Sequence, residues 1–488
     1  MKNRTNNIRI AIFCSITILG LLSCKKDFLE IKPKGKLIAQ TVSDYNLLLS
    51  NLDFLNMGSG FSGGGDAQVP MSDEVSAVDP FFSGTSLRKQ RLFRRDDVIY
   101  EPNEDALEMT VPMKNIYAYN TIINEVLNAT EGTDQLKLSL QAEAMAGRAW
   151  TYFLLINYYG KPYKAATSVT DPGFPIITQA DVTETKFARA SVKEVYDFIV
   201  NDLTAAIPNL PAQTTHRLRM SKAAAEGLLG KVYMFMGKFN EALPQLNAAI
   251  TDMGSAAIPV RLYDYNVTLG PGGSFLPIGL FGPTYPTVPN NEENVYAKQF
   301  ANTWNSTSSE LVISPQTVAL FNSTDLRLKF YKNTPYPSGT LYPYGMLRRV
   351  APSTTQFGVI VPDLYLLRAE CKARLNDLTG AKDDVEALRV KRMPSSDASV
   401  PAAIASNQLS LTKFILEERI REFAMQGFRW FDMRRLSVDP VFNTTINYIH
   451  TLYDASGSTS TFVLKPERFV LRFTQKLIDQ NPGMQNNQ

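Results

Sequence analysis

The segment from Ser221 to Ile250 constrains the fold more than any other, because it reads as two antiparallel helices in close contact. Small and apolar residues recur in it at steps of three and four, which is typical of helices that bury one face. Ser221 is suited to cap the first helix, and Gly237 to supply the left-handed residue that ends it. A helix pair cannot bury its apolar face alone, so the segment predicts further pairs.

Two other segments carry the same pattern. Helix pairs are expected around residues 105–160 and 362–393, and the Ser221 pair belongs to a third segment around 191–253. Their order of small and large residues matches tetratricopeptide helix pairs, in which small side chains such as Gly147 and Ala381 let two helices touch. The spacing is irregular, so the sequence predicts a mostly α fold with long insertions between the pairs.

The main insertion covers residues 258–361, where Gly, Pro, Asn, Ser and Tyr dominate. Short alternating pieces such as Val295–Phe300 are typical of strands. A structureless loop of that length would be unusual in a compact domain. We therefore expect an irregular, partly β region, and we place ligand binding there because insertions on a helical scaffold often carry function.

The N-terminus has the features of an exported lipoprotein. Basic residues precede a short apolar run that ends at Leu22, which is typical of a secretory signal and too short to span a bilayer. Ser23 followed by Cys24 resembles the bacterial lipobox, in which the cysteine is acylated; the alternative is an ordinary signal peptide with an incidental cysteine. We expect a signal at residues 1–23, a lipid-anchored tether at 24–42 and one domain at 43–488.

Cysteine content, net charge and hydropathy argue against several classes of protein. The chain has three cysteines, Cys14, Cys24 and Cys371, so loss of the first and acylation of the second leave Cys371 without a partner. The expected protein therefore has no disulfide framework. The net charge is +3 with interspersed signs, which argues against nucleic acid as a partner. Past residue 24 no apolar run is long enough for a transmembrane helix.

The sequence lacks the parts of a recognisable enzyme. Its two histidines, His216 and His450, are expected in surface or loop positions. Together with Cys371 they cannot form a metal cluster, so we expect no metal and no cofactor. No GxSxG nucleophile motif occurs. Gly58, Gly60 and Gly63 spell GxGxxG, but a helix precedes the motif where a nucleotide site needs a strand, which favours a loop.

Adjacent carboxylates are the remaining catalytic candidates. The pairs are Asp73 with Glu74, Asp96 with Asp97, and Asp383 with Asp384. A glycosidase needs two carboxyl groups that face each other across a sugar, whereas neighbours on a helix point about 100 degrees apart. We expect the last pair on a solvated face and no catalytic residues.

The most specific block is Leu411–Leu436, where acidic, basic and aromatic residues are crowded together. Ser410 is expected to cap its helix, and Glu417 is expected to pair with Arg421 at i,i+4. Guanidinium groups paired with helix carboxylates, with Trp430 packed under them, would make a rigid joint. This structural interpretation is stronger than a catalytic one.

This block resembles the C-terminal signature of the SusD/RagB family of surface nutrient-binding lipoproteins. The segment Phe473–Gln475 departs from the proline-containing run usual in that family. Further matching residues are Cys24–Leu29 near the start and Ile478, Asn481–Pro482 and Gln485–Asn486 at the end. The resemblance covers essentially the whole chain and implies a SusD-like α/α superhelix.

The resemblance also implies a function without catalysis. Such a protein captures a nutrient, most often an oligosaccharide, at the outer-membrane surface and passes it to a SusC-like TonB-dependent transporter. It would be anchored through Cys24 and would serve glycan uptake in polysaccharide utilization. Two alternatives remain open from the residues alone: a glycan-active enzyme such as a glycosidase, and a tetratricopeptide-type adaptor that binds proteins and no small ligand.

Aromatic residues outside the helices are the candidate ligand contacts, since flat rings stack on the apolar face of a sugar. Trp150 and Trp430 are expected in the core. Trp304 lies in the insertion without helical periodicity and is the first candidate, the alternative being a local core of that region. The full candidate set is Trp304, Phe81, Phe82, Arg88, Asn302, Tyr336, Tyr342 and Tyr344.

Overall fold

The computed structural model describes residues 39–59, 64–184, 186–279, 285–454 and 456–488. The expected signal peptide, Cys24 and most of the tether lie outside these residues. Gly60 and Gly63 of the glycine motif also lie outside them.

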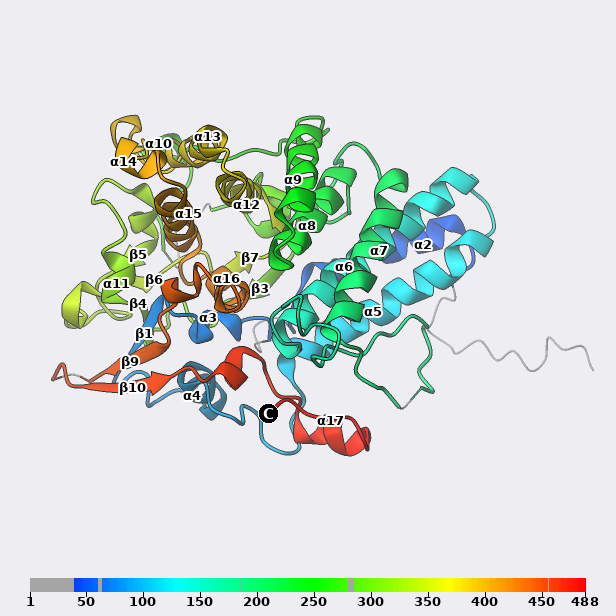
Figure 1. Cartoon of the computed structure of the whole chain (residues 1–488), viewed down its shortest axis with the longest axis horizontal. Helices are drawn as coiled ribbons and strands as arrows, with labels where there is room; N and C mark the ends of the chain where they lie inside the picture. Colours follow the sequence, from blue (N-terminus) through cyan, green and yellow to red (C-terminus); the bar gives the residue numbers. More distant parts are fainter. Residues whose placement is uncertain (1–38, 60–63, 185, 280–284, 455) are drawn as a thin grey trace, which may run out of the picture.

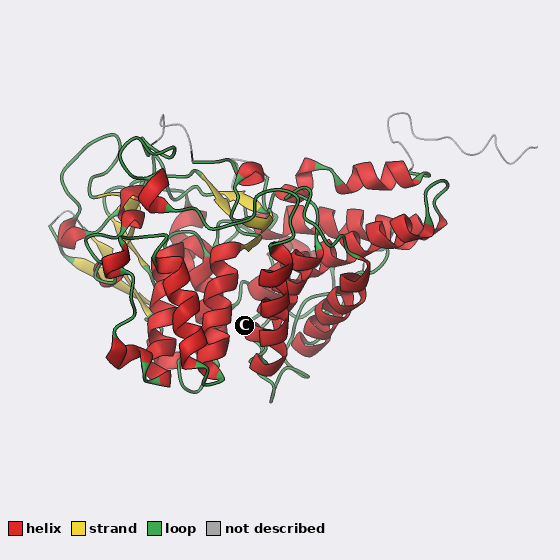
Figure 2. Cartoon of the chain, turned by 90° about the horizontal axis from the view of Figure 1, so that it is seen from above, coloured by secondary structure: helices red, strands yellow, loops and turns green. Residues whose placement is uncertain are grey.

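The predicted helix pairs are present. In Figures 1 and 2 they lie side by side and make up most of the molecule, with the strands gathered toward one end. The helices of these pairs are α5 (Leu107–Glu125), α6 (Asp134–Tyr159), α7 (Val192–Ala206), α8 (Lys222–Phe235), α9 (Phe239–Met253), α12 (Val361–Arg374) and α13 (Leu378–Arg389). The mostly α, tetratricopeptide-like fold is thereby confirmed.

Small residues bring the paired helices into contact. A Cβ atom at Gly147 of α6 would lie 2.5 Å from the ring of Tyr119 on α5, and one at Gly230 of α8 would lie 2.7 Å from Leu246 on α9. The Ser221 hydroxyl accepts a hydrogen bond from a backbone N–H of the first turn of α8, as predicted. Gly237 has a φ of +70°, so the turn between α8 and α9 uses the left-handed residue that the sequence predicts.

The C-terminal block forms α15 (Gln408–Phe423) and α16 (Phe428–Ser437). Two local predictions are wrong. The cap is Asn407 instead of Ser410, because the helix begins three residues earlier. Arg421 pairs with Glu418 at 2.8 Å instead of Glu417, because Glu418 lies on the buried side of α15.

Buried ion pairs join α16 and α15 to α12. Arg419 donates to Asp363 and to Asp432, each at 2.8 Å. Arg435 pairs with Asp432 at 2.8 Å and forms a two-pronged contact with Glu370 at 2.7 Å. All five side chains are buried, so the rigid joint expected from the sequence is present.

The inserted region is partly β, as predicted. Its two-stranded sheets pair β2 (Asn294–Tyr296) with β8 (Val359–Ile360), β3 (Gln299–Ala301) with β7 (Thr354–Gln356), and β5 (Tyr331–Lys332) with β6 (Arg348–Arg349). A four-stranded sheet has the order β10-β9-β1-β4 and contains β1 (Val75–Val78), β4 (Leu311–Ile313), β9 (Ile449–Tyr453) and β10 (Thr459–Val463). It combines the insertion with distant parts of the chain, which the sequence did not predict.

Short helices complete the chain. They are α2 (Val42–Leu49), α3 (Gln68–Met71), α4 (Leu87–Arg94), α10 (Tyr265–Thr268), α11 (Pro315–Val318), α14 (Ala402–Ala405) and α17 (Gln475–Gln480). The segment from Met71 to Tyr100 holds the strand β1 and the helix α4.

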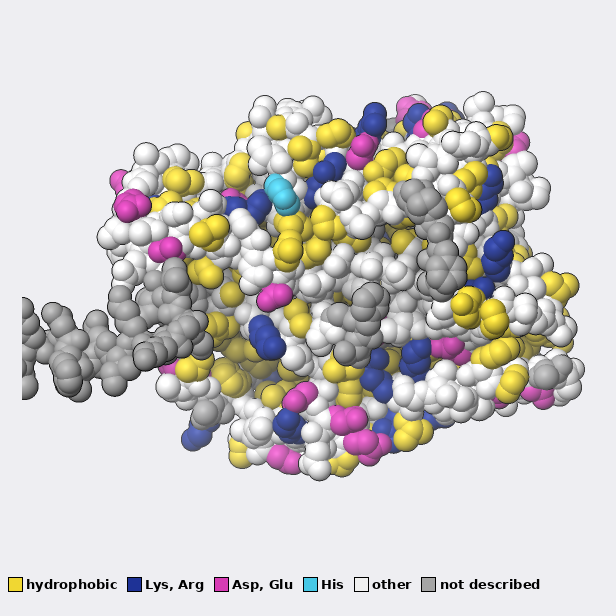
Figure 3. Space-filling view, turned by 180° about the vertical axis from the view of Figure 1, so that it is seen from behind, with side chains coloured by type: hydrophobic (Ala, Val, Ile, Leu, Met, Phe, Trp, Pro, Cys, Tyr) yellow, Lys and Arg dark blue, Asp and Glu magenta, His cyan; other side chains and the backbone are white. Residues whose placement is uncertain are grey.

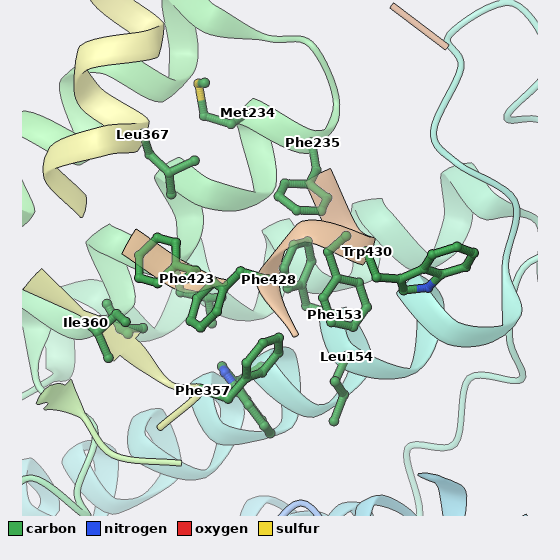
Figure 4. Close-up of a cluster of buried hydrophobic side chains, with 14 of the residues drawn as sticks. Phe153, Leu154, Met234, Phe235, Phe357, Ile360, Leu367, Phe423, Phe428 and Trp430 are labelled. Carbon is green, nitrogen blue, oxygen red and sulfur yellow. The ribbon is translucent and has the colours of Figure 1, made fainter. Parts of the chain in front are cut away.

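The main core lies where the helix pairs meet the C-terminal block. Figure 4 shows rings from different elements converging there. Phe423 stacks on Phe428 with ring centroids 4.2 Å apart, and Phe357 lies 4.6 Å from Phe428. Trp150 and Trp430 are both buried, which confirms that they are core residues.

We predict that Glu370→Gln destabilises the protein by about 3 kcal/mol at pH 7, because Arg435 and Arg374 would lose a buried carboxylate. Burial alone would raise the pKa of Glu370, but the pairing with Arg435 and Arg374 lowers it from 4.5 to about 2. Its stabilisation is therefore complete above pH 4.5 and is lost as the pH falls toward 2.

Urea unfolding at several pH values measures this difference in free energy of unfolding. The gap between the wild type and Glu370→Gln should shrink as the pH falls below 4.5. Glu417→Gln on the outer side of α15 is the matched control and should change little. A gap of constant size across this pH range would contradict the assignment.

Candidate functional site

Four loops meet beyond the carboxyl end of β1. There β1 runs antiparallel to β4 and parallel to β9, so Ala77 lies opposite Leu311 and Val78 lies beside Tyr453. The backbone N–H of Asp79 donates to the carbonyl of Tyr453 at 2.9 Å. The sheet thereby brings together the loops that follow β1 and β9, precede β4, and connect β5 to β6.

Three aromatic side chains are exposed on these loops, and we call them the aromatic face. Phe81 is 37% exposed, Tyr336 is 38% exposed and Tyr344 is 63% exposed. All three were candidates from the sequence. Their rings are free to contact a ligand, because at least a third of each side chain faces solvent.

Contacts with other segments of the chain hold the two tyrosines of the insertion. The backbone N–H of Tyr336 donates to the Ser309 hydroxyl at 2.8 Å, and the Arg348 guanidinium lies 5.9 Å from its ring centroid. The Tyr344 hydroxyl donates to the carbonyl of Gly457 at 3.3 Å, and its ring lies 5.3 Å from that of Tyr453. The β9–β10 hairpin therefore supports the insertion.

Trp304 is not an exposed platform, which corrects the leading expectation. Its side chain is completely buried, and the Lys89 ammonium lies 4.5 Å from its ring centroid. Lys89 also donates to the carbonyl of Thr303 at 2.7 Å and pairs with Glu310 at 2.6 Å. Trp304 therefore belongs to the local core of the inserted region, which is the alternative that the sequence left open.

Arg88 and Asn302 are also structural residues, contrary to expectation. Arg88 is paired with the fully buried carboxylates of Asp66 and Glu108, so its guanidinium is held in the structure by these contacts. Asn302 is buried and donates to the carbonyl of Met425 at 2.8 Å. Its side-chain oxygen accepts the backbone N–H of Trp304 at 3.1 Å, which fixes the turn around that tryptophan.

Phe82 and Tyr342 likewise face inward. Phe82 packs against Phe93 of α4 with ring centroids 5.0 Å apart. Tyr342 is buried in a small cluster with Val78, and its hydroxyl donates to the carbonyl of Ser309 at 2.9 Å. Both were wrongly expected as ligand contacts; they anchor the loops that carry Phe81 and Tyr344.

The sequence did not point to three further residues at or beneath this surface. Tyr453 is half-buried beside Tyr344, Arg348 supports Tyr336, and Leu341 is 61% exposed in the same loop. The pairing of β1 with β9 brings Tyr453 to the face, and no local pattern signals that pairing. The position of Leu341 between two candidate tyrosines was the available signal for that residue.

The histidines are not equivalent. His216 is exposed, as expected, whereas His450 is fully buried in β9. Its ring contacts the carbonyls of Phe93 and Ser72 and stacks on the ring of Phe93. Burial and the nearby Arg95 lower the pKa of His450 to about 3, so it stays neutral and links α4 to the sheet.

Carboxylates from the adjacent acidic pairs form structural ion pairs and hydrogen bonds. Asp73 pairs with Arg429 at 2.6 Å, and Glu74 accepts the backbone N–H of Met425 at 2.8 Å. Burial raises the pKa of Glu74 to about 8. Asp384 was expected on a solvated face but is buried in a contact with Arg368 at 2.6 Å.

The Asp96 and Asp97 carboxylates are also paired. Asp96 lies 2.8 Å from Arg94, and Asp97 lies 3.0 Å from Arg468. Within the described residues, none of the three adjacent pairs offers two free carboxylates that face each other.

On the face seen in Figure 3, Lys and Arg side chains are interspersed with Asp and Glu side chains, and neither sign gathers. In the part of the chain that the structure describes, no three His, Cys, Asp or Glu side chains are placed to hold a metal ion. No helix in that same part combines the length and apolar character needed to cross a bilayer.

Two family profiles match the chain. Residues 27–234 match a family described as starch-binding and associating with the outer membrane, and residues 361–488 match the SusD family. SusD-like protein P2 of Formosa agariphila is 22% identical over 346 residues. That match covers 62% of this chain and 65% of the relative, so the chain spans less than two thirds of that relative's length.

Solved structures show the same fold. A SusD superfamily protein from Bacteroides thetaiotaomicron has a TM-score of 0.68 and 21% identity, and the match covers 92% of this chain and all of the other. A SusD-like carbohydrate binding protein from Bacteroides vulgatus has a TM-score of 0.62 and 16% identity, with coverage of 91% and 99%. At this level of identity the likeness establishes the architecture alone.

We predict that Trp304→Ala lowers the free energy of unfolding by about 3–5 kcal/mol, because a completely buried indole would leave a cavity. Chemical denaturation measures the change. Tyr344→Ala, which removes an exposed ring of the same region, should stay within about 0.5 kcal/mol of the wild type. A small effect of Trp304→Ala would show that the indole is not part of the core.

Proposed function

Since the chain belongs to the SusD/RagB family, we propose that it captures an oligosaccharide on the aromatic face and delivers it to a SusC-like TonB-dependent transporter. The family associates with the outer membrane and binds carbohydrate. The observation that carries the assignment of the site is the exposure of Phe81, Tyr336 and Tyr344 around the end of one sheet.

The chemistry of this face suits a sugar. A pyranose ring has an apolar C–H face that stacks on flat aromatic side chains and a rim of hydroxyls that needs hydrogen-bond partners. Tyr336 and Tyr344 supply rings with hydroxyl groups, and Asn333 and Ser338 are exposed polar residues of the same loop. The three rings are exposed to solvent, which favours reversible binding and transfer to a transporter.

We infer binding without bond cleavage. Retaining and inverting glycosidases both need two carboxyl groups that flank the scissile bond. Two carboxylates of the loops that carry the aromatic face have partners: Glu310 pairs with Lys89, and Asp79 accepts from the backbone and hydroxyl of Ser83. A bound glycan would therefore be held and released unchanged.

The proposed route to the membrane is the lipid on Cys24. Cleavage after residue 23 would leave Cys24 as the first residue, and several acyl chains on it would anchor the protein stably. Residues 24–42 would then be the tether and residues 43–488 the single binding domain. The helical side would dock on the transporter, with the aromatic face turned toward its lumen.

We predict that Tyr344→Ala and Tyr336→Ala each weaken glycan binding about tenfold, which corresponds to the loss of one stacked ring. A glycan array on the form that lacks residues 1–24 first identifies the ligand, and isothermal titration calorimetry then compares the variants. The melting temperatures should stay close to that of the wild type.

Tyr117→Ala is the matched control, because Tyr117 is a tyrosine of α5 that is 44% exposed and lies outside the aromatic face. It should bind like the wild type. If all three variants bound the glycan with equal affinity, the binding site would lie outside the aromatic face. Release of a shortened glycan on incubation would instead indicate an enzyme.

We predict that Cys24→Ala abolishes acylation. In cells grown with radiolabelled palmitate, the wild-type chain should carry label in the outer-membrane fraction, and the variant should carry none. Cys371→Ala is the control, since Cys371 is buried and its replacement should leave the label unchanged. Label on the Cys24→Ala protein would exclude this residue as the anchor.

A further inference from the structure

A small buried cavity of about 20 Å³ separates the inserted region from α15. Arg349 of β6 and Gln356 of β7 line it from the insertion, and Arg421 lines it from α15. Each of these three side chains is more than nine-tenths buried. The cavity is far from the size of a sugar and has room for a single small occupant, such as a water molecule or a monatomic ion.

Each of the three side chains leaves one buried polar atom without a hydrogen-bond partner. The atoms are Nε of Arg349, Nη2 of Arg421 and Oε1 of Gln356. The other two guanidinium nitrogens of Arg421 do have acceptors. Arg421 donates through Nε to Glu418 at 2.8 Å and through Nη1 to the carbonyl of Leu320 at 3.2 Å. Two of these atoms, Arg349 Nε and Arg421 Nη2, are hydrogen-bond donors. A buried donor without a partner costs free energy, so an occupant that accepts hydrogen bonds would stabilise the cavity.

Around the cavity, the arginine side chains outnumber the carboxylates that pair with them by one. Arginines and carboxylates balance in the neighbouring network, whose members are Arg327, Arg389, Arg392 and Arg421 with Asp325, Glu293, Glu418 and Glu422. Arg349 is additional. It donates through Nη1 to the Tyr331 hydroxyl at 3.0 Å, and no carboxylate of the described residues lies within ion-pair distance of it.

We propose that this cavity binds a chloride ion. The ion would accept from Nε of Arg349 and Nη2 of Arg421 and would neutralise the unpaired guanidinium charge. A water molecule could accept the same two bonds but would leave that charge uncompensated in a region of low dielectric, where such a charge is costly.

The other residues that line the cavity are compatible with a chloride ion. No hydrogen bond within the described residues fixes the side-chain amide of Gln356, so it is free to turn and present its NH₂ group as a third donor. The Glu293 and Glu422 carboxylates also line the cavity, but Arg392 contacts both of them and Arg327 contacts Glu422. The ion would join β6 and β7 to α15.

Thermal unfolding of the full chain tests this proposal. We expect the melting temperature to rise by about 2 °C, in a saturable manner, when chloride replaces gluconate at constant ionic strength. Arg349→Gln should abolish the difference between the two salts. The readout is that difference, so a lower stability of the variant itself does not affect the conclusion.

Arg348→Gln is the matched control, since Arg348 is the adjacent residue of β6 and donates to the carbonyls of Thr334 and Ser306 outside the cavity. It should keep the chloride effect. In a bromide soak of the crystallised protein, an anomalous peak should lie within hydrogen-bond distance of Arg349 Nε. Water at that position without anomalous signal, or a chloride effect that survives Arg349→Gln, would overturn the proposal.

Discussion

Buried pairs between guanidinium groups and carboxylates hold the whole architecture together. Helices α15 and α16 contribute a charged partner to contacts with several other parts of the chain. Arg435 reaches Glu370 on α12, Arg429 reaches Asp73 just before β1, and Glu418 accepts from Arg327 of the insertion. Burying these charges carries a desolvation cost, which good geometry and full pairing offset. The C-terminal block thus acts as the common anchor of the helix pairs, the sheet and the insertion.

The aromatic face depends on this anchor indirectly. Its tyrosines lie on loops without regular structure, yet those loops are tied to the sheet through Ser309, Tyr342 and Tyr453. The sheet is in turn fixed to α16 by the pair of Asp73 with Arg429. If the proposed ligand stacks on them, rings held in this way would lose little conformational freedom, so more of the stacking energy would be available for affinity.

The sequence predicts the helical part of the molecule well and the candidate aromatic face poorly, for physical reasons. Residues at steps of three and four report directly on a buried helix face, and Gly147 and Gly237 have the roles that their positions indicate. In the insertion no such periodicity exists, so a lack of pattern around Trp304 did not distinguish an exposed ring from a buried one. The pairing of β1 with β9 joins residues far apart in the sequence, and local patterns carry no information about it.

The order of strands in the four-stranded sheet affects how the protein reaches its native state. Its members come from the first, the middle and the last part of the chain, and β9 lies between β10 and β1. A chain that emerges from an export channel with its N-terminus first would leave β1 paired on one side only until the segment from Ile449 onward has passed. The arrangement of the loops that carry Phe81 and the tyrosines is therefore among the last features to assemble, and a polypeptide cut short before β9 would keep helix pairs but lack a complete aromatic face.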